Sequence, residues 1–153
     1  MSALTKDFMR HNLISSQSVA AVVVTSDANG TSVDMRGYNA VCFIVDVGIE
    51  GDTLSGSVMF EFEIEDSSDN STFADAANAD VLDGAGAAGT TGSNNGTFAT
   101  VDANAEIPAR FLGFYTGTAR YVRPVINVTG SHSNGTPISI IAIRCKADVL
   151  PAV

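Results

Sequence analysis

The chain of 153 residues has 17 Asp and Glu against 8 Lys and Arg, a formal net charge of −9, and 45% of its residues are hydrophobic. A chain of this length is expected to form one domain with its own core, and its ordinary apolar content argues against intrinsic disorder. Nucleic acid is a poor partner for so acidic a protein, because phosphate neutralisation needs clustered Lys and Arg.

Residues 1–16 carry only a weak pattern and are predicted to form an extended N-terminal arm. Charged side chains interrupt them, so they contain no signal-peptide core. The apolar stretches 19–24 and 40–45 are too short to cross a bilayer. We therefore expect a protein made in a cytoplasm, with no membrane partner. In that compartment Cys42 and Cys145 are expected to be buried, reduced thiols.

From residue 17 onwards the sequence has the pattern of β-strands separated by turns. Apolar and β-branched runs predict strands at 19–25, 31–34, 39–47, 58–65, 81–82, 97–101, 111–115, 120–129 and 137–146. The nearly all-apolar run 39–47 is typical of a central strand covered on both faces. No segment has a helical period. The prediction is an all-β fold: a single antiparallel β-sandwich or small barrel of jelly-roll or Greek-key type over 17–153.

The strand at 58–65 has the clearest alternation in the chain. Val58, Phe60, Phe62 and Ile64 fall on one face, and Glu61, Glu63 and Glu65 fall on the other. The glutamates are about 7 Å apart along the strand, a spacing within the range of paired carboxyls in glycoside hydrolases. Catalysis also needs a cleft and a raised pKa. A solvated or partner-facing strand face is therefore the favoured interpretation.

The segment 83–96 has five glycines and no side chain larger than Asp, Asn or Thr. It cannot anchor in a core, so it is predicted to be a loop that is functional or disordered. It lacks the Lys-Ser/Thr pair of a phosphate-binding loop.

The evidence for other catalytic or metal-binding sites in the sequence is weak. Asp66, Asp69 and Asn70 offer oxygen ligands, but their spacing does not fit a calcium-binding loop, and a polar turn is favoured. The two histidines, His11 and His132, belong to no catalytic or metal-binding motif. The sequence predicts neither a cofactor nor a metal nor an enzymatic activity.

Charge is unevenly distributed along the chain. Residues 37–109 contain thirteen acidic residues and no Lys or Arg, while the flanks hold all eight basic residues and four acidic ones. Two interpretations stay open. The protein is a bipolar module that docks its basic regions onto a partner, or the separation of charge along the sequence disappears in three dimensions because acidic and basic strands interleave.

The run GFYTGTARYVRPVINVTG at 113–130 resembles a pattern of small virion proteins from tailed phages and prophages, in which a Gly-Tyr/Phe element leads to an Arg-Tyr-Val-Arg strand ending in Thr-Gly. The layout of the rest is similar: a Val-rich first strand, VDMRGY at 33–38 and a Glu-rich strand at 60–66. The C-terminal segment 144–148 matches the family pattern less closely, which bears on the assignment to a subfamily more than on the fold. The chain thus resembles the capsid decoration, or cement, proteins of tailed bacteriophages.

This resemblance implies a non-enzymatic protein made in the host cytoplasm and located on the virion. Such a protein binds the major capsid protein at the outer surface of the head and stabilises it by bridging capsomers. It is expected to form a homo-oligomer, a dimer or trimer.

Two sets of contact residues are predicted. An arm can add a strand to an exposed sheet edge, so the candidate capsid contacts are the apolar anchors Leu4, Phe8, Leu13 and Ile14 with the basic Lys6 and Arg10; a frayed terminus is the alternative. The candidate inter-subunit contacts are Arg120, Tyr121 and Arg123 with Glu61, Glu63 and Glu65. Pro124 cannot donate to a ladder, so its strand is predicted to be at an edge or to carry a bulge.

Two other functions are open. The first is a tail or head-tail junction protein. The second is a carbohydrate-binding β-sandwich, which would need exposed aromatic rings, and the chain has no Trp and only three tyrosines, Tyr38, Tyr115 and Tyr121.

Overall fold

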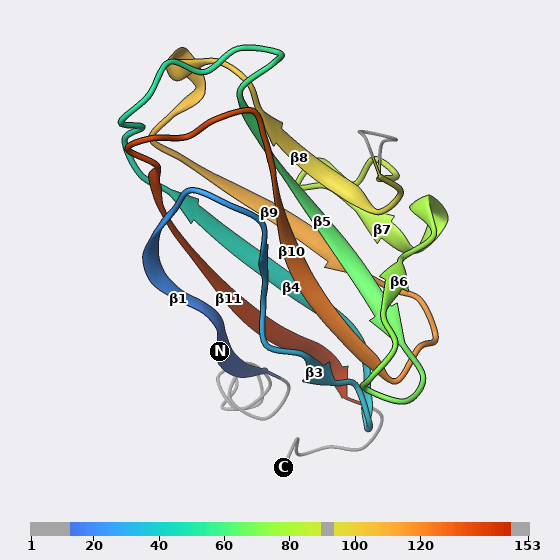
Figure 1. Cartoon of the computed structure of the whole chain (residues 1–153). Coiled ribbons are helices and arrows are strands. Elements are labelled where there is room, and N and C mark those ends of the chain that lie inside the picture. Colours follow the sequence, from blue (N-terminus) through green and yellow to red (C-terminus); the bar gives the residue numbers. More distant parts are fainter. Residues whose placement is uncertain (1–12, 90–93, 148–153) are drawn as a thin grey trace, which may run out of the picture.

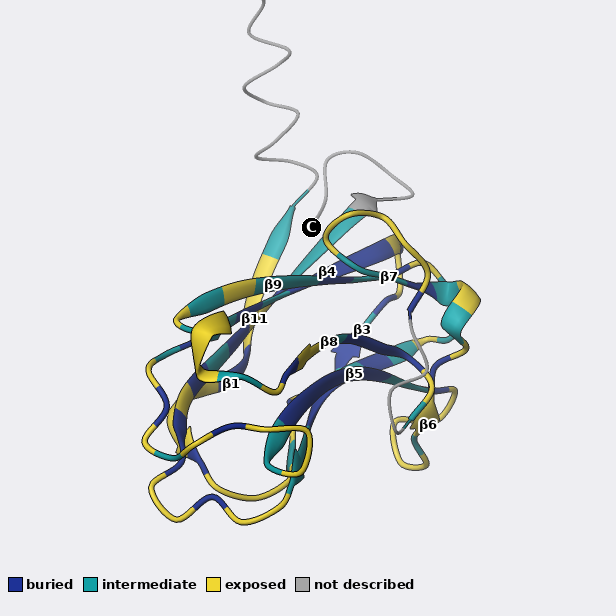
Figure 2. Cartoon of the chain, turned by 90° about the horizontal axis from the view of Figure 1, so that it is seen from above, coloured by how far each residue is buried: buried dark blue, intermediate teal, exposed yellow. Residues whose placement is uncertain are grey.

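The computed structural model describes residues 13–89 and 94–147, which form two antiparallel β-sheets packed face to face (Figures 1 and 2). The predicted β-sandwich is confirmed. The sheets do not close into a barrel, so that alternative is wrong.

The first sheet, sheet A, has five strands. In spatial order they are β1 (Ile14–Val24), β11 (Thr136–Ala147), β4 (Tyr38–Val47), β9 (Ala109–Tyr115) and β7 (Val81–Leu82). The second, sheet B, is built on the pair β10 (Tyr121–Thr129) and β5 (Met59–Ser67). Four shorter strands flank this pair: β2 (Ala28–Asn29), β3 (Val33–Asp34), β6 (Ala74–Asp75) and β8 (Thr97–Val101). Two short 3-10 turns, η1 (Asn78–Asp80) and η2 (Asn104–Glu106), lie in the connections.

The core lies between β5 and β4. Phe60, Phe62 and Ile64 of β5 are fully buried, as the alternation predicts, and each such side chain contributes roughly 1.5–3 kcal/mol through burial. From the other sheet, β4 contributes a fully buried face, and β9 contributes Phe111, whose ring stacks on that of Phe62 with the centroids 6.0 Å apart. β4 is the central strand of sheet A, as expected. Its outward-facing Ile44 is only half-buried, however, so the prediction of full cover on both faces is wrong.

The predicted arm ends earlier than expected. β1 begins at Ile14, and the backbone from Ile14 to Ser16 pairs with β11 from Arg144 to Ala142. The side-chain pattern of these residues is too weak to predict a strand. They form one because the backbone N–H and C=O groups of β11 need hydrogen-bond partners, whatever side chains the partner strand carries. β2 was likewise missed: its two residues were predicted as part of a turn, and they pair with Val125 and Ile126 of β10.

β10 shows how a proline is accommodated. One side of the strand pairs with β5 over its whole length, while the other side pairs with β3 and β2, which leave a gap at Pro124. The carbonyl of Pro124 accepts a hydrogen bond from Gly30 N at 2.8 Å in this gap. The missing N–H therefore falls in the interruption between β3 and β2. Because β10 has paired neighbours on both sides and a continuous register with β5, the prediction of an edge strand or a bulge is wrong.

The two cysteines are free. Cys42 is buried, and that burial, with a smaller contribution from Cys145, raises the pKa of its thiol to about 11. Cys145 is only half-buried, so the expectation of two buried thiols holds for one of them.

The two ends of the glycine-rich segment are ordered. At the first end, the Asp83 carboxylate accepts hydrogen bonds from Ala85 N and Ala87 N. At the second, Gly96 is buried, its N–H donates to Asn78 Oδ1 at 2.7 Å, and its carbonyl accepts from Ile64 N. Residues 90–93 lie outside the described part of the chain.

Replacing Gly96 by alanine is expected to destabilise the fold by about 3 kcal/mol. Gly96 has φ +75°, and a Cβ there would lie 2.6 Å from Ile64 O, so a left-handed conformation and a backbone clash add. Gly86→Ala is the control, because Gly86 has φ +82° with nothing within 4 Å and is expected to cost only roughly 1 kcal/mol. Urea denaturation measures both, and equal losses would contradict the role of the clash.

Candidate interaction site at the arginine end

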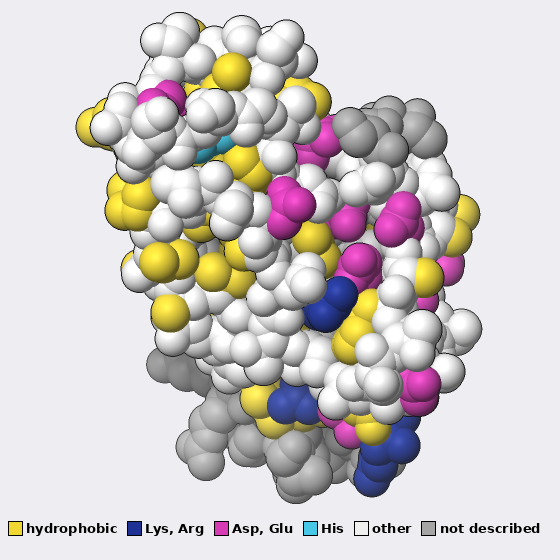
Figure 3. Space-filling model, viewed as in Figure 1, with side chains coloured by type: hydrophobic (Ala, Val, Ile, Leu, Met, Phe, Trp, Pro, Cys, Tyr) yellow, Lys and Arg dark blue, Asp and Glu magenta, His cyan; other side chains and the backbone are white. Residues whose placement is uncertain are grey.

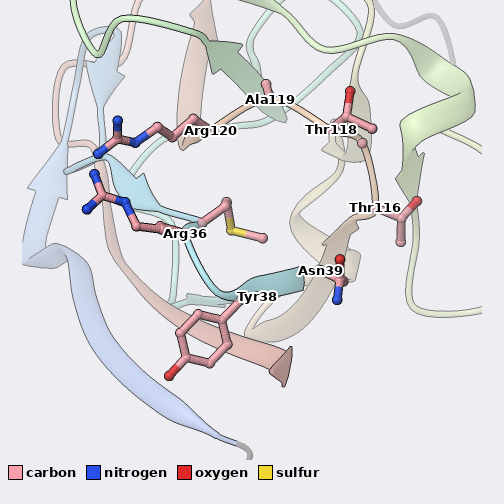
Figure 4. Close-up of a pocket in the computed structure, with 9 residues that line it drawn as sticks. Arg36, Tyr38, Asn39, Thr116, Thr118, Ala119 and Arg120 are labelled. Carbon is pink, nitrogen blue, oxygen red and sulfur yellow. The ribbon is translucent and has the colours of Figure 1, made fainter. Parts of the chain in front are cut away.

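One end of the sandwich gathers three arginines from distant parts of the sequence. We call it the arginine end: it comprises the β3–β4 connection (35–37), the β9–β10 connection (116–120) and the last residues of β11. A pocket of about 600 Å³ opens between the two connections. Figure 4 shows the side chains of Arg36 and Arg120 lying next to each other at one side of this pocket, with Thr116 and Asn39 at the other.

Asp34 of β3 organises these arginines. Its carboxylate pairs with Arg120, whose Nη2 lies 3.2 Å from Oδ2, and accepts a hydrogen bond from Arg36 N at 3.0 Å. Its carbonyl oxygen accepts one from Arg144 Nη1 at 3.0 Å. Arg120 and Arg144 also lie over the rings of Tyr121 and Tyr38, each 4.8 Å from the ring centroid. The Asp34 carboxylate thus pairs with one guanidinium, that of Arg120, while the Arg144 guanidinium contacts the Asp34 backbone carbonyl and the Arg36 side chain is exposed. Three basic side chains therefore lie around a single aspartate at this end of the described chain.

Tyr115 fixes the loop that forms one wall of the pocket. Its ring is buried, and its hydroxyl donates to Asp66 Oδ2 at 2.8 Å and accepts from Ala119 N at 3.2 Å. The bond to Asp66 crosses from sheet A to sheet B. Burial, reinforced by that bond, raises the pKa of Tyr115 above its usual value. A Cβ at residue 117 would lie 2.4 Å from the Tyr115 hydroxyl, so only glycine fits there.

The residues predicted as inter-subunit contacts lie mainly on the outer face of sheet B. Arg123 pairs with Glu65 at 2.6 Å within the chain and lies 4.2 Å from the centroid of the Phe73 ring. Arg123 thus pairs with the glutamate strand of its own chain, whereas Arg120 pairs with Asp34. Whether Arg120, Tyr121 or Arg123 also touches another subunit stays a prediction.

The glutamate face is not the solvated surface that its alternation predicts. Glu61 is 3% exposed and Glu63 is 2% exposed, although both point away from the core. Strands β8, β6 and β10 and the segment from Asn94 to Gly96 surround them. Burial raises the pKa of Glu63; a hydrogen bond from Asn94 opposes this shift, and Asp75 and Glu65 reinforce it. Burial by residues that are distant in sequence cannot be predicted from the alternation of apolar and polar residues along one strand.

The predicted arm residues Leu4, Lys6, Phe8 and Arg10 lie outside the described residues, as does His11. Of the other two arm anchors, Leu13 is half-buried, and Ile14 packs against the core at the start of β1. Ile14 pairs with Arg144 of β11. The described chain therefore begins beside the arginine end (Figure 1).

The outer face of sheet A is apolar. Two cross-strand rows form it: Ile143, Cys42, Phe114 and Leu82 in one, and Ile141, Ile44 and Leu112 in the other. Ile141 is 38% exposed, and the turn at Gly84 lies against Leu112 at one side of the rows. A continuous row of apolar side chains on an outer sheet face is typical of protein contact surfaces.

Figure 3 shows the sheet B side of the molecule. Asp and Glu gather along and beside β5, and most of the basic side chains gather at the arginine end. The separation is partly cancelled in space, because Arg110, Arg120 and Arg123 pair with Asp46, Asp34 and Glu65.

None of the three tyrosines offers an exposed platform for a sugar. Tyr115 is 1% exposed, Tyr38 is 8% exposed, and Tyr121 is half-buried beside Arg120. This observation argues against the carbohydrate-binding alternative. No described helix is long and apolar enough to span a membrane.

No family model matches the chain, and no curated protein matches it. Among solved structures, the SPBc2 prophage-derived protein YomS is 10% identical with a TM-score of 0.48, covering 88% of this chain and 95% of that one. A chain from the capsid of Ralstonia phage GP4 is 14% identical with a TM-score of 0.34, covering 88% and 82%. Likenesses this distant do not by themselves assign a function.

Replacing Glu63 by glutamine is expected to stabilise the protein at pH 7 by roughly 1 kcal/mol, because it removes an incompletely paired buried charge. A raised folded-state pKa means that the contribution of Glu63 is favourable below its usual pKa of 4.5 and is lost as the pH rises. The advantage of Glu63→Gln therefore shrinks as the pH falls towards 4. Urea denaturation at several pH values measures it.

Glu65→Gln is the matched control on the same strand. It breaks the ion pair with Arg123 and is expected to lower stability at pH 7. A loss of stability in Glu63→Gln as well would contradict the cost assigned to that buried carboxylate.

Proposed function

We propose that this protein is a non-enzymatic structural protein of a phage particle that binds the outer surface of the head and stabilises it by bridging capsomers. The observation that carries the proposal is the arginine end, where Arg36, Arg120 and Arg144 meet at the point where the described chain begins. The sequence resemblance to decoration proteins supports the same conclusion.

The arginine end is suited to contact an acidic protein surface. Arg36 is exposed, and Arg120 and Arg144 are held in place by Asp34, so little conformational freedom is lost when a carboxylate partner arrives. The described chain begins beside this end, where Ile14 pairs with Arg144, and the apolar and basic side chains of residues 1–12 can extend the contact along the major capsid protein. Arg36 and its neighbours set the orientation, and residues 1–12 add contact area.

The first test is binding to heads that lack the protein. Purified protein is expected to bind such heads at micromolar concentration and to raise the temperature at which they disrupt. Arg36→Glu is expected to weaken binding at least about tenfold, since it places like charges opposite each other at a docking site. Arg110→Glu is the control, because Arg110 is exposed near the opposite end of sheet A, beside Asp46. Absence of binding, or equal loss in both variants, contradicts the proposal.

The outer face of sheet A is proposed as the contact between copies of the chain. A two-fold contact would place these apolar rows against the same rows of a second copy. Ile141→Lys is expected to convert the oligomer to monomers in sedimentation equilibrium. Ile49→Lys, in a 75% exposed position of the β4–β5 connection, is expected to leave it intact. A wild-type protein that stays monomeric at millimolar concentration would exclude this contact.

A tail or head-tail junction protein is the alternative within the same class. It predicts a copy number per particle close to that of a ring or tube, whereas a decoration protein is present in numbers close to those of the shell protein. Quantitative mass spectrometry of purified particles separates the two.

A further inference from the structure

The opposite end of the sandwich is closed by three connections, which we call the loop end: 48–58, 102–108 and 130–135. Each of them crosses from one sheet to the other. They are tied together by hydrogen bonds: Asn104 Nδ2 donates to Asp52 O at 2.9 Å, Leu54 N donates to Asn104 Oδ1 at 2.8 Å, and Gly51 N donates to Gly135 O at 3.2 Å.

Two of these connections bring Glu50, Asp52 and His132 together. One ligand atom from each lies within 4.8 Å of the others. The side chains of Glu50 and His132 are 0% exposed, and the Phe60 ring packs on the imidazole with the centroids 4.3 Å apart. Neither the charge of Glu50 nor the polar edge of His132 has access to solvent.

The hydrogen bonds leave two buried polar atoms without a partner. His132 Nε2 lies 3.1 Å from Thr129 O. Because a carbonyl only accepts, Nε2 carries the hydrogen and Nδ1 of a neutral imidazole presents a lone pair. Nδ1 has no hydrogen-bond partner and lies 3.8 Å from Glu50 Oε1, and Glu50 Oε2 is also unpartnered.

The carboxylates themselves are held in place by backbone and amide donors. Glu50 Oε1 accepts from Asp52 N at 3.0 Å. Asp52 Oδ2 accepts from Asn134 N and Gly135 N, and Oδ1 accepts from Asn134 Nδ2, all at 2.9 Å. These bonds, that from Gly135 foremost, lower the pKa of Asp52. Two carboxylates are thus pre-oriented around one imidazole lone pair.

We propose that Glu50, Asp52 and His132 bind a divalent transition-metal ion, with His132 Nδ1 and one carboxylate oxygen from each acid as ligands. The 3.8 Å between Nδ1 and Oε1 is too long for a hydrogen bond, but it suits two ligands that each lie about 2.0–2.2 Å from one ion. Two carboxylates and a neutral imidazole balance a charge of +2. The imidazole favours zinc-like ions over calcium and magnesium.

The bond between His132 Nε2 and the Thr129 carbonyl is the kind of outer contact that fixes the tautomer of a metal-bound histidine. A second acidic group, Glu63 with Glu65 and Asp75, carries no such proposal. There the Arg123 guanidinium already lies 2.6 Å from Glu65 and supplies the positive charge.

The bound ion would join the β4–β5 connection to the β10–β11 connection and so link the two sheets at the loop end. This site goes beyond the proposed function and does not depend on it. The competing explanation is a doubly protonated His132 that balances Glu50 by charge alone.

The test is a titration of the full chain, stripped of metal with a chelator, with Zn²⁺ and separately with Ca²⁺. We expect one Zn²⁺ per chain with micromolar affinity and a rise in Tm of several degrees under saturating Zn²⁺, with no comparable effect of Ca²⁺. In the wild-type protein, Zn²⁺ is expected to shift the NMR resonance of His132 Nδ1 and to leave Nε2 protonated.

Glu50→Gln is nearly isosteric and is expected to weaken Zn²⁺ binding by at least about tenfold, the loss seen when even an outer-shell partner is removed. His132→Asn is expected to abolish it. His11→Gln removes the other histidine, and Glu63→Gln alters the second acidic group; both are expected to bind as the wild type does. The proposal is overturned if Zn²⁺ fails to bind at millimolar concentration, if Glu50→Gln binds equally well, or if NMR shows both His132 nitrogens protonated and indifferent to Zn²⁺.

Discussion

The packing of β5 against sheet A is the constraint on which the rest of the structure depends. Phe60, Phe62 and Ile64 must face inwards, so Glu61, Glu63 and Glu65 must face outwards. A one-residue slip would reverse both faces at once. β10 pairs along the whole of β5 and brings Arg123 opposite Glu65. β8 and β6 pair with the other side of β5. The outer face of sheet B is therefore a polar and mainly acidic layer, in which Arg123 pairs with Glu65 within the chain.

With the faces of the sandwich set in this way, the ends become the places where side chains from distant positions converge. In an antiparallel sandwich every connection lies at one end or the other, and here the two ends carry different kinds of side chain. Residues 36, 120 and 144 meet at the arginine end around Asp34, while residues 50, 52 and 132 meet at the loop end around two unpartnered atoms. Each end is held by a buried side chain: Tyr115 of β9 bonds across to Asp66 of β5, and His132 packs on Phe60 of β5 and lies beside Glu50 of the β4–β5 connection.

Much of the fold could be predicted from the sequence, because the long strands carry their own pattern. The runs at 39–47 and 58–65 match β4 and β5 closely. Pro124 was a misleading signal, because the gap between β3 and β2 accommodates it in a strand that has partners on both sides. The burial of Glu61 and Glu63 could not be predicted, since the residues around Glu63, such as Asn94 and Asn127, are distant from it in sequence. The grouping of Glu50, Asp52 and His132 has no motif spacing for a similar reason: 80 residues separate Asp52 from His132, and only the fold brings them together.

The uneven charge along the chain acquires a limited physical meaning from the structure. The acidic middle of the sequence becomes β5, its neighbours and the loop end, while most of the described basic residues become the arginine end. At physiological ionic strength, however, charges more than about 8 Å apart are screened, so this uneven distribution has little effect on capture from a distance. Its effect is at contact, where a positive end that meets an acidic surface is favoured over the reverse docking, whose like charges repel each other. The charge pattern therefore selects an orientation, and the affinity has to come from apolar contacts.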